Sequence, residues 1–179
     1  MSEMIIARRY ARALLDSVPA DQSAGVYESL LEVARMIDEV EELKRFIHNP
    51  LLPLAVQQKI LTALFADKLP ASIYQFFCFL SFKGRLDLLK EVITAFEEFY
   101  LENKKRSKAL IQSAFPLDAQ MKEIIVAKLK EITHKDIIPT YAVHSSMIGG
   151  IRIFNSWKLY EYSFRNELQD YKRKALQRI

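Results

Sequence analysis

The chain has 179 residues, of which 50% are hydrophobic and 11% aromatic, enough to bury one large core or two small ones. Its 26 basic and 22 acidic residues are intermixed, and this composition excludes an intrinsically disordered chain. The net charge of +4 permits contact with nucleic acid or an anionic membrane and requires neither, and no apolar run approaches the ~18 residues of a transmembrane helix, so any membrane role is peripheral.

The first hundred residues show the spacing of amphipathic helices. A first helix is expected over residues 4–18, where apolar residues recur at steps of four. Ala7 and Ala11 lie beside this apolar stripe and make that side of the helix shallow, so that another helix can approach it. The opposite side is charged, and Arg12 and Asp16 have the spacing of an i,i+4 ion pair.

The next helices are separated by clear breaks. Residues 22–47 carry a long amphipathic pattern that we expect to divide into two helices near Asp38–Glu41. Asn49-Pro50 ends this pattern, and Pro53 suits the start of a fourth helix. A sixth helix is expected over residues 85–103.

The fifth predicted helix, residues 71–82, is apolar on every side. One face carries Ile73, Phe76, Phe77 and Leu80, and the other faces carry Tyr74, Cys78, Phe79 and Phe82. A helix of this kind is either central in a bundle or covered by a partner. Gly84 is expected to end it. Cys78 is the only cysteine, so the chain has no internal disulfide, which fits a reducing compartment.

The hydrophobic period changes after the basic run at residues 103–108, which we interpret as the domain boundary. A strand is expected over residues 109–114, followed by a helix whose N-cap is Asp118. The sequence therefore predicts a mainly α fold, with an N-terminal six-helix bundle over residues 1–104 and a small α/β C-terminal domain over residues 105–179.

The C-terminal part contains two of the four glycines of the chain, Gly149 and Gly150, side by side. They follow a predicted strand at residues 137–143 and precede a second β-rich run, which suggests a bend or a close approach of another chain. A β-hairpin is expected through Asn155-Ser156, and a last helix over residues 163–178.

The residues capable of chemistry form no reactive pattern. Gly149-Gly150 lacks the Lys-Ser/Thr ending and the spacing of a phosphate-binding loop. The three histidines have no cysteine or acidic pair near them at metal-ligand spacing, and paired carboxylates such as Glu97-Glu98 fall on helix surfaces. We therefore predict no catalytic residue, no metal site and no cofactor, and we interpret the chain as an interaction module.

Five short motifs follow one another along residues 7–168. They are Ala7-Arg-Arg-Tyr-Ala-Arg-Ala-Leu14, Lys83-Gly-Arg-Leu86, Ser113-Ala-Phe-Pro-Leu117, Met147-Ile-Gly-Gly-Ile-Arg-Ile153, and Ser163 with Leu168. In content and order they resemble the delta subunit of bacterial F-type ATP synthases, whose mitochondrial relative is the oligomycin-sensitivity-conferring protein. The chain departs from the family pattern at Ser156-Trp157, where a Gly-Asp turn is usual, and at Glu161-Tyr162, where Asp-Gly is usual.

This resemblance implies a non-catalytic stator subunit. In the family, the N-terminal domain binds the N-terminal helices of the alpha subunits on top of the catalytic head, and the C-terminal domain binds the C-terminal end of the peripheral-stalk b subunit. The link keeps the head from turning with the rotor, so that proton-driven rotation is coupled to ATP synthesis. The resemblance also implies peripheral association with the cytoplasmic face of the cell inner membrane, without a nucleic-acid partner.

The resemblance further implies where the partners bind. A groove between the first and fifth predicted helices is expected to hold an alpha-subunit helix, because small residues and an excess apolar face meet there. The expected groove residues are Ala7, Tyr10, Ala11, Leu14, Ile73, Phe76, Phe77 and Leu80. The alternative is that all of them are ordinary bundle core.

The stalk contact is expected around the glycine pair and the start of the last helix. The expected residues are Ile148, Gly149, Gly150, Ser163 and Leu168. The alternative for the two glycines is a purely structural turn.

Two other functions stay open from the residues alone. The first is a basic helical RNA-binding module, suggested by the basic run at 103–108 and by Lys172-Arg-Lys174, although the chain lacks the glycine-aromatic RNA motifs and a basic stripe along one helix. The second is a small enzyme with a dispersed site.

Overall fold

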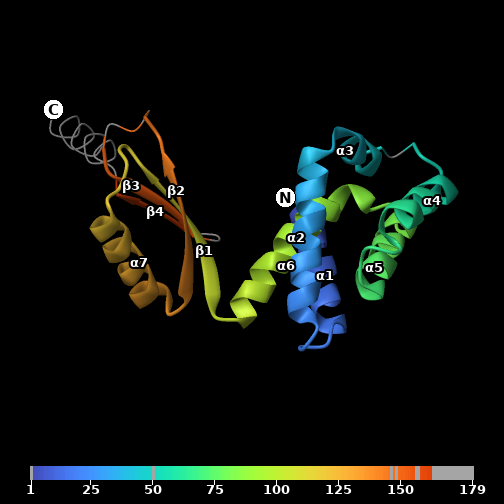
Figure 1. Cartoon of the computed structure of the whole chain (residues 1–179), viewed down its shortest axis with the longest axis horizontal. Coiled ribbons are helices and arrows are strands. Elements are labelled where there is room, and N and C mark those ends of the chain that lie inside the picture. Colours follow the sequence, from blue (N-terminus) through green and yellow to red (C-terminus); the bar gives the residue numbers. More distant parts are fainter. Residues whose placement is uncertain (1, 50, 146, 148, 156–157, 163–179) are drawn as a thin grey trace, which may run out of the picture. The chain divides into compact units, whose positions relative to one another are not determined.

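The structure is a computed structural model that describes residues 2–49, 51–145, 147, 149–155 and 158–162 (Figure 1). The chain forms two compact units, Met1–Tyr100 and Leu101–Ile179. The described residues contain seven α-helices, one short 3-10 helix and a four-stranded sheet. The predicted fold class, mainly α with a small α/β part at the C-terminal end, is therefore confirmed. The predicted helix over residues 163–178 lies outside the described residues.

The first unit is entirely helical in the residues described. Its elements are α1 (Ser2–Ser17), α2 (Ser23–Glu39), α3 (Glu41–Ile47), α4 (Leu54–Phe65), α5 (Ala71–Phe82), η1 (Leu86–Leu88) and α6 (Leu89–Asn103). The expected break near Asp38–Glu41 falls at Val40, whose backbone is extended. Pro53 and Pro70 are the N-caps of α4 and α5, where their missing N–H groups leave no helix bond unmade.

The end of α5 shows how local sequence sets a boundary. Gly84 takes a left-handed conformation with φ of 62°. The Arg85 N–H then donates to the Leu80 carbonyl at 2.9 Å, and the Gly84 N–H donates to the Ser81 carbonyl at 2.9 Å, as in a Schellman cap. The sixth helix was expected to start at residue 85, and this is wrong by one turn, because η1 follows the cap and α6 starts only at Leu89.

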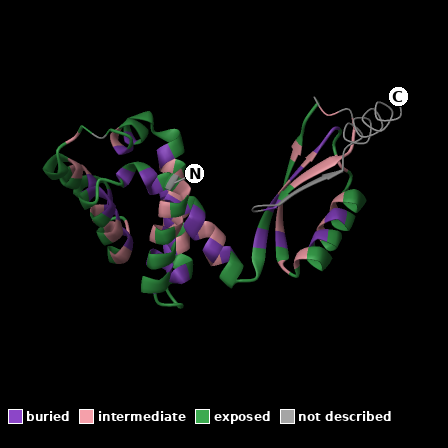
Figure 2. Ribbon diagram, turned by 180° about the vertical axis from the view of Figure 1, so that it is seen from behind, coloured by how far each residue is buried: buried purple, intermediate pink, exposed green. Residues whose placement is uncertain are grey.

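The core of the first unit is built from the inner sides of all six helices (Figure 2). Phe77 of α5 and Phe96 of α6 are its largest fully buried side chains. The Phe77 ring meets Phe65 of α4 edge to face, with centroids 5.6 Å apart. Two hydrogen bonds also join α4 to α5, from Ser81 to Gln57 at 2.7 Å and between Thr62 and Tyr74 at 2.9 Å.

Helix α1 is held between α5 and α6. Ala7 and Ala11 face the core and are completely buried, because a methyl group lets neighbouring backbones come close. On one flank the Tyr10 ring contacts Phe79 of α5, with centroids 6.1 Å apart. On the other flank Arg8 donates to Glu98 of α6 at 2.8 Å. These contacts fix which sides of α1 remain exposed.

The second unit is a four-stranded sheet with one helix. Its elements are β1 (Arg106–Ser113), α7 (Ala119–Thr133), β2 (Asp136–Val143), β3 (Ile151–Asn155) and β4 (Lys158–Tyr162). The strand order is β2-β1-β3-β4, with β1 and β2 parallel and the other pairs antiparallel. The antiparallel pairing of β3 and β4 is the one that the predicted hairpin requires, and its expected turn residue Ser156 lies outside the described residues. β1 begins at Arg106, three residues earlier than expected, so part of the basic run is strand and not linker.

Alternate residues of the sheet pack against α7. Ala109, Ile111 and Ile137 from the strands form a small core with Ile125 and Leu129 of the helix. The predicted N-cap is confirmed, since the Asp118 carboxylate accepts from the Met121 N–H at 2.7 Å. A buried hydrogen bond from Ser107 to Asn155, 2.6 Å long, joins β1 to β3 beside this core.

The boundary between the two compact units, after Tyr100, falls in the last turn of α6, four residues before the proposed domain division between residues 104 and 105. We keep the later division as a proposal. Helix α6 ends at Asn103 and β1 begins at Arg106, so the division falls in the short turn between them. Lys105 in this turn has a positive φ of 52°, which ends the helical conformation before the strand starts.

A pair of phenylalanine substitutions on α5 separates core from surface. Phe77→Ala removes a fully buried ring, and we expect the free energy of unfolding to fall by about 3–5 kcal/mol. Phe82→Ala, on the same helix but 63% exposed, is expected to change it by less than about 0.5 kcal/mol. Urea unfolding followed by circular dichroism measures both, and equal losses would contradict the packing described here.

Alanine substitutions at Gly25 and Gly84 should change the free energy of unfolding in opposite directions. Gly25 lies inside α2 with open space around the site of a Cβ, so Gly25→Ala is expected to raise the free energy of unfolding by about 0.5–1 kcal/mol. Gly84→Ala meets equally open space but a left-handed backbone, so it is expected to lower the free energy by about 1 kcal/mol. Thermal and urea unfolding check the signs, and a stabilising Gly84→Ala would contradict the cap.

Candidate functional site

Most of the expected groove residues lie inside the bundle. Ala7, Ala11 and Leu14 of α1 and Ile73, Phe77 and Leu80 of α5 have exposed fractions of 0–3%. Only Tyr10 and Phe76 of the eight are half-buried. The expectation that all eight line an open groove is therefore corrected, because the 3.6-residue period turns the small and apolar side of α1 inward, where the chain's own side chains cover it.

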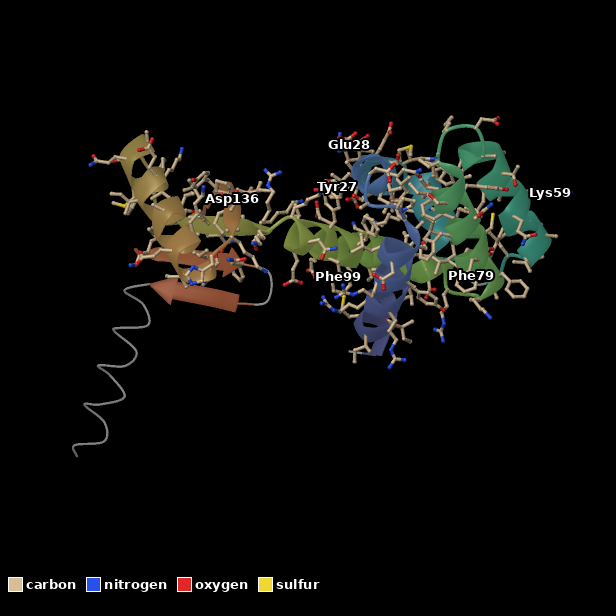
Figure 3. All side chains as sticks on the ribbon, turned by 90° about the horizontal axis from the view of Figure 1, so that it is seen from below. Tyr27, Glu28, Lys59, Phe79, Phe99 and Asp136 are labelled. Carbon is tan, nitrogen blue, oxygen red and sulfur yellow. The ribbon has the colours of Figure 1, made fainter. Side chains whose placement is uncertain are left out.

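An exposed aromatic face lies beside these core residues. Phe79 is 43% exposed and Phe82 is 63% exposed, and both belong to α5 (Figure 3 labels Phe79). Tyr10 of α1 joins them through its edge-to-face contact with Phe79. The Lys83 ammonium lies 5.6 Å from the Phe79 centroid and 5.5 Å from the Phe82 centroid. We call Tyr10, Phe79, Phe82 and Lys83 the aromatic face.

The aromatic face has the properties of a docking surface. Large apolar rings left in water are costly, and burying one against a partner releases roughly 1.5–3 kcal/mol. The helix that carries most of the aromatic face is held in place, because two hydrogen bonds join α5 to α4 and Phe77 of α5 packs in the core. Sequence reasoning missed Phe79 and Phe82, although the all-round apolar pattern of residues 71–82 was the signal that pointed to them.

The glycine pair lies where the chain passes from β2 to β3. β2 and β3 lie on either side of β1, and Ser113 at the C-terminal end of β1 is the register partner of both Val143 and Ile151. The His144 N–H donates to the Ser113 carbonyl at 2.8 Å. Gly150 has a φ of 94°, which an L side chain rarely adopts, and Gly149 is half-buried beside it. The expected bend is confirmed, while Ile148, Ser163 and Leu168 lie outside the described residues.

Helix α7 carries a second exposed apolar surface. Met121 is 43% exposed, Ile124 is 55% exposed and Ile132 is 51% exposed. Their spacing places them along one side of the helix, next to the side that Ile125 and Leu129 turn toward the sheet. We call Met121, Ile124 and Ile132 the α7 stripe.

The ionisable groups give little sign of a reactive site. In the described part of the chain, no three His, Cys, Asp or Glu side chains come together as a metal site. A hydrogen bond from Lys128 lowers the pKa of Glu131, and one from Lys130 lowers the pKa of Asp136. Both carboxylates are surface members of ion pairs 2.8 Å long, so their pKa shifts reflect a lysine neighbour and not a desolvated pocket. None of the described helices is long and apolar enough to cross a membrane.

Comparison with known proteins gives one family over nearly the whole chain. The family model described as ATP synthase delta (OSCP) subunit matches residues 6–175. The chain is 28% identical over 172 residues to ATP synthase subunit delta of Clostridium botulinum strain Langeland, covering 96% of each chain. It is 28% identical over 177 residues to ATP synthase subunit delta of Carboxydothermus hydrogenoformans, covering 97% of this chain and 98% of the relative.

A solved structure has the same fold. The chain is similar in structure to a chain of the Toxoplasma gondii mitochondrial ATP synthase hexamer, with a TM-score of 0.74 and coverage of 95% of this chain and 97% of the other. The two sequences are only 21% identical, so this structural similarity shows the fold alone.

Proposed function

The chain belongs to the ATP synthase delta (OSCP) subunit family, and from this premise we propose that it is the stator subunit that links the catalytic head to the peripheral stalk. The observation that carries the proposal is the extent of the match, since residues 6–175 span both units of the chain. The subunit is non-catalytic in this proposal and acts by holding two partners together. It takes part in proton-driven ATP synthesis by keeping the head from turning with the rotor.

The proposed partner of the first unit is the N-terminal helix of an alpha subunit. The aromatic face supports this, because Phe79, Phe82 and Tyr10 offer rings from two adjacent helices to the apolar side of an amphipathic helix. The core residues of the expected set, such as Ala7 and Phe77, support the face from below by fixing the spacing of α1 and α5.

The proposed partner of the second unit is the C-terminal end of the b subunit. The α7 stripe supports this, since three large apolar side chains along one helix are suited to pack against another helix. A direct contact of Gly149 and Gly150 with the stalk stays a proposal, and the φ of Gly150 by itself supports a structural turn. Through these partners we propose that the chain lies at the cytoplasmic face of the cell inner membrane as a peripheral component.

The RNA-binding alternative gains no support from the comparisons. The relatives reported above carry the name of an ATP synthase subunit, and part of the basic run that suggested RNA lies in β1. The stator role is tested by adding the purified chain to membranes stripped of catalytic heads and of this subunit. We expect heads to rebind and ATP-driven proton pumping to return only in its presence, and heads that rebind equally well without it would overturn the proposal.

Phe79→Glu should separate binding from folding in the first unit. The substitution removes the ring that contacts the alpha-subunit N-terminal peptide and buries an unpaired charge in its place. We therefore expect the affinity for this peptide to fall at least 10-fold. Because Phe79 is 43% exposed, the free energy of unfolding should change by less than about 1 kcal/mol. Fluorescence anisotropy and urea unfolding measure the two quantities. Phe115→Glu, at a residue 72% exposed in the second unit, is the matched control and should leave this affinity unchanged.

Substitutions at two neighbouring isoleucines of α7 should separate partner binding from folding stability in the second unit. Ile124→Glu should weaken binding of a C-terminal b-subunit peptide at least 10-fold while the protein stays folded, because this side chain is 55% exposed. Ile125→Ala, at a residue 9% exposed, should instead lower the free energy of unfolding by about 2–5 kcal/mol. Calorimetric titration and urea unfolding read out both variants, and unchanged binding by Ile124→Glu would remove the α7 stripe as the stalk contact.

A further inference from the structure

A shallow furrow runs along the outer side of α1, away from the aromatic face. Its volume is about 560 Å³, and it is lined by Ile5, Arg8, Arg9, Arg12, Ala13 and Asp16. We call it the arginine furrow. It spans three turns of helix, roughly 16 Å, a length that another short helix can cover.

Two of the three guanidinium groups of this furrow, those of Arg8 and Arg12, are held in place by α6. The Arg8 guanidinium carbon lies 4.6 Å from the Phe99 ring centroid, and that of Arg12 lies 4.3 Å from it (Figure 3 labels Phe99). Phe99 is buried, so its ring is a fixed support for both arginines. The ion pairs of the described residues do not include Arg12 with Asp16, although the spacing of these two residues predicts one.

The furrow carries positive charge that ion pairs among the described residues neutralise only in part. Arg8 is paired with Glu98 at 2.8 Å. Within the described residues, no carboxylate forms an ion pair with Arg9 or Arg12, and both side chains are exposed. Asp16 places one negative charge at the far end of the furrow. The surface thus carries a pattern of two positive charges followed by one negative charge.

The furrow also has apolar surface beside its charges. Ile5 is 56% exposed at the start of the furrow, and Ala13 is exposed two turns further along α1. A partner that fits must therefore offer carboxylates to Arg9 and Arg12, an apolar side chain to Ile5, and a basic group to Asp16. We propose that the arginine furrow binds an acidic amphipathic helix of a partner protein, separate from the helix bound at the aromatic face.

The chemistry favours a helix over a lipid surface or a nucleic acid. Arginine pairs with a carboxylate through two parallel hydrogen bonds, and guanidiniums already fixed over Phe99 lose little freedom on binding. A bilayer or a phosphate backbone presents one sign of charge and meets repulsion at Asp16, whereas a helix can place a lysine there.

The probe is a synthetic amphipathic peptide of about three to four helical turns, with glutamates and a leucine on one side and a lysine at the end that meets Asp16. The control peptide has glutamine in place of each glutamate. Binding to the full chain is followed by fluorescence anisotropy at low and at high salt. We expect the acidic peptide to bind at least 10-fold more tightly than its control, and the difference to shrink as salt is raised.

Variants locate the binding to the furrow. Arg9→Glu, alone and combined with Arg12→Glu, should weaken the acidic peptide at least 10-fold, whereas Asp16→Lys should weaken a peptide with a terminal lysine and strengthen one with a terminal glutamate. Arg12→Lys keeps the charge but loses the planar fork, and is expected to weaken binding a few-fold. Arg9 is exposed, so Arg9→Glu should stay folded, as circular dichroism will check, even if the double variant does not.

Other outcomes overturn the inference. Equal binding of the two peptides, or binding that Arg9→Glu leaves unchanged, would remove the furrow as an acidic-helix site. Loss of binding in Phe79→Glu would mean that the peptide occupies the aromatic face. Tighter binding to phosphatidylserine vesicles or to RNA, with the same dependence on Arg9, would assign the furrow to those partners instead. None of these outcomes bears on the stator role, which rests on other surfaces.

Discussion

The seating of α1 between α5 and α6 is the contact on which the surfaces of the first unit depend. Two alanines, Ala7 and Ala11, make it possible, since larger side chains would push the helix out of the core. Once α1 is seated, Tyr10 must meet Phe79 on one flank and Arg8 must meet Glu98 on the other. The two exposed surfaces of α1 are consequences of this single packing arrangement.

The two flanks of α1 differ in chemistry, and this difference separates the partners that they fit. The aromatic face offers rings to an apolar helix side, and the arginine furrow offers fixed guanidiniums to carboxylates. The second unit adds the α7 stripe on a core of its own, with Ile111 and Leu129 at its centre. A protein that links other subunits needs such independently folded units, because each contact must withstand load without unfolding the other.

The sequence determined the elements of this chain and their order. The boundaries at Pro53 and Gly84 follow from backbone chemistry that each residue carries locally, and the Asp118 cap follows from its side chain. Where the signal was weaker the boundary moved, as at Leu89 after the short 3-10 helix. The family motifs also lie in the sequence itself, so the expected fold and family did not require coordinates.

Only the tertiary structure decided which apolar side chains are core and which are surface. Phe77 and Phe79 are the same residue type two positions apart, yet one is fully buried and the other is 43% exposed. A helix that is apolar all round gives no period from which to choose, and the choice is made by where α1, α4 and α6 pack. The same holds for Arg12, whose sequence neighbour Asp16 suggested a local ion pair, whereas the fold brought the buried ring of Phe99, 87 residues away, beneath its guanidinium.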